Sequence, residues 1–172
     1  DTLTRHAAPA GRAGLGIRLG LQTAAALAIT AGMLLDAIVP VLAGAGVLAA
    51  AVIAHAVVLV LQLRKALPAR FAPLVRYYVA AAVVFLGGIA LGAMMAASHA
   101  DGLADRLVGA HLVLNAFGWI GLTALGTLVL LWPTVLHARV DEAADADARR
   151  ALPILLAGPV IAAAGPAVGV QP

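Results

Sequence analysis

Long apolar runs separated by short polar segments dominate the pattern of this 172-residue chain. The four firm runs cover residues 15–35, 41–63, 77–97 and 110–139. Each run is close to or above roughly 20 residues, the length that an α-helix needs to cross the hydrocarbon core of a bilayer. Because backbone groups in lipid must be hydrogen-bonded within their own segment, the runs predict helices. The predicted fold class is therefore all-α, a polytopic transmembrane helical bundle.

A fifth apolar segment contains Pro159 and Pro166 and predicts only a weak, proline-broken span. The pattern leaves open whether this segment crosses the membrane, re-enters it or lies at its surface. The predicted organisation is a polar cytoplasmic lead-in at 1–14, a four-helix membrane domain at 15–139, a charged cytoplasmic loop at 140–153, and a weak fifth span or tail at 154–172. The lead-in lacks the apolar core of a signal peptide. We expect the chain to be a fragment, with further helices outside it.

Composition narrows the function classes. Hydrophobic residues make up 63% of the chain and charged residues 11%, which is far more apolar than a soluble domain. The chain has no cysteine, which excludes disulfides, thiolate-bound zinc and iron–sulfur clusters within it. The net charge of +3 does not indicate nucleic-acid binding, since the basic residues lie mainly between the apolar runs.

The distribution of lysine and arginine predicts the orientation. With the N-terminus inside, ten basic residues fall on the cytoplasmic side and only Arg106 falls outside. The ten are Arg5, Arg12, Arg18, Arg64, Lys65, Arg70, Arg76, Arg139, Arg149 and Arg150. Alanine, glycine and arginine are frequent, which suggests a GC-rich bacterial genome. We predict a multi-pass protein of the bacterial inner membrane with a cytoplasmic N-terminus.

The fourth run carries His111 near its start. Steps of three and four along a helix place Asn115 and Gly118 on the same face. A neutral imidazole beside residues of little bulk leaves room for a flat ligand such as a porphyrin, whose iron the imidazole can ligate. The alternative is that the glycines are close-packing sites between membrane helices.

His55 lies deep within the second run and is the second candidate ligand. A histidine buried in lipid needs a partner, which is a cofactor, a hydroxyl such as Thr23 or Thr30, or a backbone carbonyl. The two histidines differ in depth by about seven residues, roughly 10 Å along the helices. This mismatch argues against His55 and His111 as trans ligands of one haem, and we expect a helix outside the chain to supply a ligand.

Other histidines and methionines give weaker signals. Met94, Met95 and His99 combine thioether and imidazole groups, which suit copper(I), but two methionines and one histidine are a weak pattern. Copper is therefore not expected within this chain. His6 and His137 are expected to be solvated.

The stretch from His111 to Thr134, with Asn115, Gly118 and a terminal Trp132-Pro133, resembles a histidine-bearing helix of the haem–copper oxidase subunit I superfamily and its NnrS-like relatives. His55 with residues 62–71 and 76–81 resembles actinobacterial oxidase-like membrane proteins, and the resemblance covers residues 15–140. It implies haem b, with His111 and His55 as ligands. The chain departs from true oxidases because it lacks their paired histidines at a copper–haem centre, so oxygen or nitric oxide reduction is not implied.

Three functions remain open at this point. The first is a haem-binding redox domain that exchanges electrons with a periplasmic copper or redox protein and is at most part of an oxidoreductase. In it, Asn115 and Gly118 shape the pocket beside His111. The second is a non-catalytic membrane anchor or assembly scaffold for a copper-handling partner, in which the histidines only form hydrogen bonds. A transporter fragment is the third, and the lack of buried acids argues against it.

Overall fold

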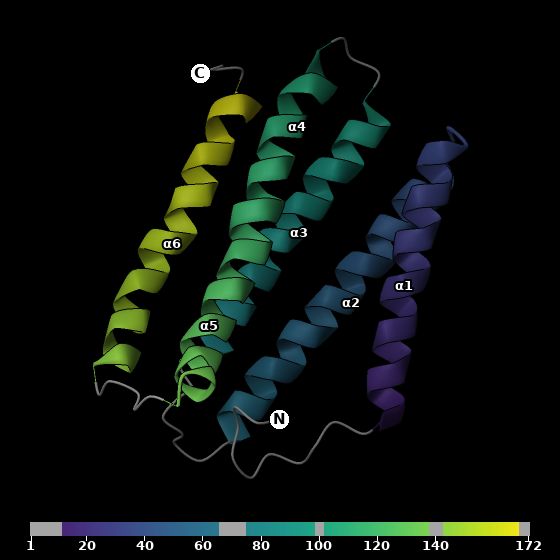
Figure 1. Ribbon diagram of the computed structural model, residues 1–172. Helices are drawn as coiled ribbons and strands as arrows, with labels where there is room; N and C mark the ends of the chain where they lie inside the picture. The colour runs from purple at the N-terminus through teal and green to yellow at the C-terminus, as the bar shows by residue number, and fades with distance from the viewer. Residues whose placement is uncertain (1–11, 66–74, 99–101, 138–142, 169–172) are drawn as a thin grey trace.

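The computed structural model describes residues 12–65, 75–98, 102–137 and 143–168, and every regular element in these ranges is helical. The helices are α1 (Arg12–Leu34), α2 (Ile38–Lys65), α3 (Val75–Ala97), a rod made of α4 (Leu103–Val113), η2 (Leu114–Gly121) and α5 (Leu122–Val135), and α6 (Ala144–Ala167). Consecutive rods run in opposite directions and lie side by side (Figure 1). The all-α bundle is therefore confirmed.

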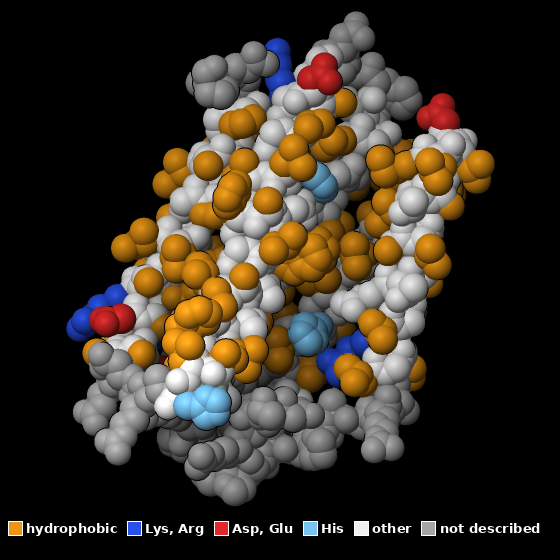
Figure 2. All heavy atoms as spheres, viewed as in Figure 1, with side chains coloured by type: hydrophobic (Ala, Val, Ile, Leu, Met, Phe, Trp, Pro, Cys, Tyr) orange, Lys and Arg blue, Asp and Glu red, His pale blue; other side chains and the backbone are white. Residues whose placement is uncertain are grey.

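Five helices of the described ranges are long and apolar enough to cross a membrane: Gly14–Leu34, Ile38–Arg64, Val75–Ala97, Leu103–Val129 and Ala144–Ala167. Large apolar side chains such as Leu27 and Ile161 are exposed on their outer faces. Figure 2 shows apolar side chains over the length of the bundle, while most charged side chains lie towards its two ends. This distribution suits lipid rather than water around the helices, and the chain is a multi-pass membrane protein.

The hairpin of α1 and α2 is held by close backbone approach. A Cβ atom on Gly44 would lie 2.8 Å from the carbonyl oxygen of Ala25, and one on Gly32 would lie 2.7 Å from Cγ2 of Val41. Glycines let membrane helices pack at such short separations. The turn between the helices holds Asp36 at a φ of 51°.

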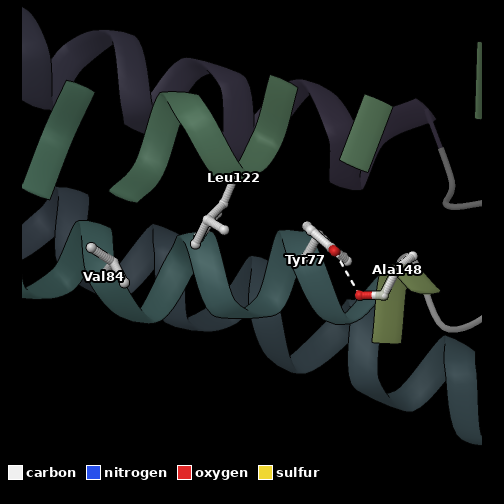
Figure 3. Close-up of a cluster of buried hydrophobic side chains, with 5 residues drawn as sticks. Tyr77, Val84, Leu122 and Ala148 are labelled. Carbon is white, nitrogen blue, oxygen red and sulfur yellow. Dashed lines mark hydrogen bonds between the residues drawn. The ribbon is translucent and has the colours of Figure 1, made fainter. Parts of the chain in front are cut away.

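The best-buried part of the bundle lies among α3, α5 and α6. Tyr77, Val84 and Leu122 pack there with two alanines, Ala81 and Ala148. Figure 3 shows Tyr77 on α3 pointing to the first turns of α6, where its hydroxyl donates a hydrogen bond of 2.6 Å to the carbonyl oxygen of Ala148. Tyr77 is only 3% exposed and joins two helices.

Replacing Tyr77 by Phe should lower the free energy of unfolding by about 1 kcal/mol, because a buried hydrogen bond between helices is lost. Titration of the detergent-solubilised protein with sodium dodecyl sulfate, followed by circular dichroism, measures this change. Tyr78→Phe is the matched control. It should cost less, since Thr127, the partner of Tyr78, keeps its own bond of 2.8 Å to the carbonyl oxygen of Thr123. Equal effects of the two variants would contradict this assignment.

The predicted proline-broken fifth span and the predicted loop at 140–153 need correction. Within the described residues, α6 is one helix from Ala144 to Ala167 and contains Pro153, Pro159 and Pro166. Its first turns are favoured by acidic residues near the positive end of the helix dipole and by an ion pair of 2.8 Å between Asp145 and Arg149. Each proline removes one N–H donor, and packing against α4 and η2 keeps the helix continuous.

Candidate functional site

His111 is anchored by a backbone group of the neighbouring helix. Its Nδ1 atom lies 2.9 Å from the carbonyl oxygen of Gly88 on α3. A carbonyl oxygen can only accept, so Nδ1 carries the hydrogen and the neutral ring presents a lone pair at Nε2. Nε2 makes no hydrogen bond to any residue in the described ranges.

Asn115 supports this arrangement from the next turn. Its Nδ2 atom donates a hydrogen bond of 2.7 Å to the carbonyl oxygen of His111. A Cβ atom on Gly88 would lie 2.6 Å from Nδ2 of Asn115, and one on Gly92 would lie 3.0 Å from Cε1 of His111. His111 and Asn115 therefore fit against α3 because positions 88 and 92 carry no side chain.

The predicted role of Gly118 beside His111 is not what the structure shows. Gly118 is buried, and a Cβ atom there would collide with Val84 of α3 and approach Pro159 of α6 to 3.8 Å. Gly118 thus serves helix packing, which is the alternative that the sequence left open. The small residues beside the imidazole are Gly88 and Gly92. A spacing of four between glycines is typical of close packing between membrane helices, but the pattern of one helix does not show which neighbour such a pair meets.

A π-helical segment begins three residues after His111. In η2 the hydrogen bonds skip one more residue than in an α-helix, and the N–H of Leu114 is shared between the carbonyl oxygens of Ala110 and His111. The side chain of Asn115 supplies a further donor to His111 at this point. Such π segments are frequent at functional sites because they change the direction in which side chains leave a helix.

His111 and Asn115 line an apolar cavity of about 410 Å³ between the α1–α2 hairpin and the α3–α4 pair. The space-filling view is hollowed between these two parts of the bundle (Figure 2). Apart from His111 and Asn115, the described lining residues are apolar: Ile29, Met33, Val41, Ala45, Leu48, Phe85, Ile89, Gly92, Ala93, Met95, Ala96 and Ala104. A largely apolar cavity with a few convergent polar groups is typical of a ligand site.

One wall of the cavity is stiffened by an aromatic stack. Phe85 of α3 lines the cavity, and its ring lies over that of Trp119 in η2, with centroids 3.9 Å apart and planes 13° from parallel. The stack joins α3 to the π segment just after Asn115. Nothing in the sequence pattern paired these two aromatic residues.

His55 lies elsewhere. It is exposed on α2, and its Nδ1 atom lies 3.4 Å from Nη1 of Arg18 on α1. Arginine can only donate, so Nδ1 of His55 accepts and Nε2 carries the ring hydrogen. Neither nitrogen then offers a free lone pair to a metal, and His55 is not among the residues that line the cavity of His111.

The depth of the two histidines also differs. His55 lies 17 residues after the start of α2, whereas His111 lies eight residues after the start of α4. Both helices start at the same end of the bundle (Figure 1), and the difference of nine residues corresponds to about 13 Å of helix at roughly 1.5 Å per residue. That His55 and His111 do not ligate one iron stays a prediction.

The remaining candidate metal ligands are dispersed. In the part of the chain that the structure describes, no group of three or more His, Asp or Glu side chains could hold a metal ion. Met95 lines the cavity, whereas Met94 is 53% exposed. His137 is exposed in the turn after α5. His6, His99 and Arg139 lie outside the described residues, as do most of the lead-in and the last residues of the tail.

Comparison with family models, curated proteins and solved structures finds no match to this chain. The resemblance to oxidase subunit I and to NnrS-like proteins therefore stays a prediction.

Proposed function

We propose that the chain is a haem-binding, electron-transferring membrane domain in which Nε2 of His111 is an axial ligand of haem b. The observation that carries the proposal is the hydrogen bond from Nδ1 of His111 to the carbonyl oxygen of Gly88. Metal-ligating histidines commonly donate their other N–H to such an oxygen, which fixes the tautomer and the ring orientation. A bound haem would supply one-electron redox chemistry.

The apolar chemistry of the cavity fits this role. Its volume of about 410 Å³ lies within the range of roughly 300–1,000 Å³ for cofactor sites. Its walls are apolar, as a macrocycle requires, and the ring of Phe85, held by stacking on Trp119, is part of the lining. None of the described lining residues is charged.

Two methionines of the cavity lining are candidates for a second haem ligand, since a histidine–methionine pair is an established form of haem ligation. Met95 from α3 is half-buried, whereas Met33 from α1 is 69% exposed, which favours Met95. A helix outside the chain is the other source. His111 lies about 12 Å from the start of α4, at the end of the bundle that positive charge assigns to the outside. That position favours a redox partner on the outer face.

His111→Ala tests the proposal. The purified wild-type chain, supplemented with haem, should show a Soret band and a reduced-minus-oxidised difference spectrum, and His111→Ala should lose most of both because the axial ligand is gone. His55→Ala is the control and should keep the spectrum, since His55 is bound to Arg18 outside the cavity. Absence of a haem spectrum in the wild type, or equal spectra in all three proteins, would refute the haem function.

A non-catalytic anchor or scaffold for a copper-handling partner is the alternative. The observation that favours it is that His55 and His111 each already have a hydrogen-bonding partner within the protein. In that case His55→Ala and His111→Ala both assemble with the copper-handling partner, and added haem gives no Soret band in any of the proteins.

A further inference from the structure

Arg18 places a permanent positive charge within the first membrane span. The residue lies inside the candidate span Gly14–Leu34, about 9 Å along α1 from its start at Arg12. Its Nε atom donates to the carbonyl oxygen of Gly14 at 3.3 Å, and its Nη1 atom lies 3.4 Å from Nδ1 of His55. Arg18 is half-buried, and these contacts tie it to its own helix and to α2.

No carboxylate balances this charge in the described part of the chain. The two ion pairs found there join Arg149 to Asp145 and Arg150 to Asp147, both within α6. A guanidinium group at the edge of the hydrocarbon region is costly unless an anion or water meets it. The neutral ring of His55 orients Arg18 but does not neutralise it.

The pair presents only donors to an incoming ligand. Nη1 and Nη2 of Arg18 keep further N–H groups, and the tautomer required by the Arg18 contact leaves an N–H at Nε2 of His55. Guanidinium donors match the geometry and charge of phosphate oxygens. A ligand that brings its own positive group, or only donors, does not fit.

The surroundings leave the pair accessible from lipid. His55 is exposed. On the same face of α1 as Arg18, Leu15 and Leu21 are 58% and 46% exposed, and an added Cβ atom at Gly14 would meet nothing within 4 Å, so α1 has an open apolar surface beside Arg18. Arg18 lies about 9 Å from the start of α1, and His55 lies ten residues, about 15 Å, before the end of α2 at Lys65, so the pair is in the half of the bundle where α2 ends and α3 begins. Long cationic side chains near helix ends reach for the headgroup layer, and basic sites between helices bind anionic headgroups there.

We propose that Arg18 and His55 form a binding site for the phosphodiester headgroup of an anionic phospholipid, whose acyl chains lie along the open surface of α1. The site is separate from the cavity of His111, so it stands or falls independently of haem binding. Phosphate chemistry is shared by a lipid headgroup and by free phosphate. The apolar surface beside the pair favours the lipid.

Native mass spectrometry of the full chain tests the site. Protein reconstituted with equal amounts of phosphatidylglycerol and phosphatidylcholine is extracted into mild detergent, and the lipids that remain bound are counted. The wild type should retain phosphatidylglycerol preferentially, and Arg18→Gln should retain about fivefold less, the effect of about one cationic contact at the membrane surface. Arg64→Gln removes the same charge from an exposed position without the Arg18–His55 contact, so it loses only the general attraction for anionic lipid, which mild detergent disperses, and should retain more phosphatidylglycerol than Arg18→Gln.

Two further measurements separate the alternatives. His55→Ala should weaken retention less than Arg18→Gln, because it removes one neutral donor and leaves the charge. Inorganic phosphate added to the extracted complex should not displace the lipid. Equal retention by the wild type and Arg18→Gln, with both proteins helical by circular dichroism, would overturn the proposal, as would equal retention of the two lipids or full displacement by inorganic phosphate.

Discussion

Replacing Gly88 by Ala should disrupt the support of His111 and destabilise the bundle. The new Cβ atom would lie 2.6 Å from Nδ2 and 2.9 Å from Oδ1 of Asn115, closer than such atoms can approach. Asn115 cannot turn away freely, because its Nδ2 atom is hydrogen-bonded to the carbonyl oxygen of His111. Either this bond breaks or α3 and α4 separate. We expect a loss of about 1–3 kcal/mol in the free energy of unfolding, the cost of leaving buried polar groups without partners.

The adjacent glycine provides a matched control. A Cβ atom on Gly87 would approach only Cδ1 of Leu114, at 3.4 Å, which is an ordinary van der Waals contact. Because alanine favours a helix over glycine by about 1 kcal/mol, Gly87→Ala should be neutral or stabilising. The midpoint of unfolding in sodium dodecyl sulfate distinguishes the two variants. If Gly88→Ala is as stable as Gly87→Ala, Asn115 does not occupy the position described here.

The same pair of variants also reports on the proposed haem site. The carbonyl oxygen of Gly88 accepts the hydrogen of His111 Nδ1, so a displaced α3 should weaken haem binding as well as stability. Gly87→Ala should leave the Soret band unchanged. If Gly88→Ala is destabilised but binds haem with full affinity, Asn115 packs against Gly88 as described, but the carbonyl oxygen of Gly88 does not contribute to haem binding.

The membrane spans could be predicted because the thickness of a bilayer requires a helix of about 20 apolar residues to cross it. Four of the five helices follow from apolar runs of about 20 residues, with ends that differ from the prediction by a few residues in three of them. The fifth helix was predicted only as a weak span because proline was assumed to break a helix in the membrane as it does in water. In a membrane a helix continues past a missing N–H, since no solvent competes for the remaining backbone groups and neighbouring helices hold it in place. The Asp145–Arg149 spacing was the signal that the helix extends into the charged segment.

From the sequence, the site could be predicted only for residues that share a helix with His111. Steps of three and four correctly placed His111 and Asn115 on one face, and the contact of both with α3 follows from that face. The pairing with Gly88 and Gly92 depends on which helices become neighbours, which helical periodicity does not encode. The π segment that follows His111 also has no sequence signature that an α-helical face analysis detects. For this reason Gly118 was assigned to the wrong surroundings.

Replacing Leu122 by Ala should be the most destabilising single truncation in the core. Leu122 is fully buried where α5 meets α3, beside Tyr77 and Val84 (Figure 3). Truncation leaves a void that these neighbours cannot fill without moving α3. In soluble proteins such changes cost roughly 2–5 kcal/mol, of which part is the transfer of the side chain from water. Membrane helices separate into lipid rather than water, so the loss reduces to dispersion and cavity terms, and we expect about 2 kcal/mol.

Leu128→Ala on the same helix separates packing from helix propensity. Leu128 is 49% exposed, so its truncation removes contacts with lipid and should change the free energy of unfolding by less than about 0.5 kcal/mol. Both variants make the same chemical change in α5, and unfolding in sodium dodecyl sulfate compares them directly. Because Tyr77 also bonds to Ala148, the Leu122→Ala void should in addition loosen α6, giving faster hydrogen exchange in its first turns. Equal stabilities of the two variants would mean that α3, α5 and α6 do not meet around Leu122.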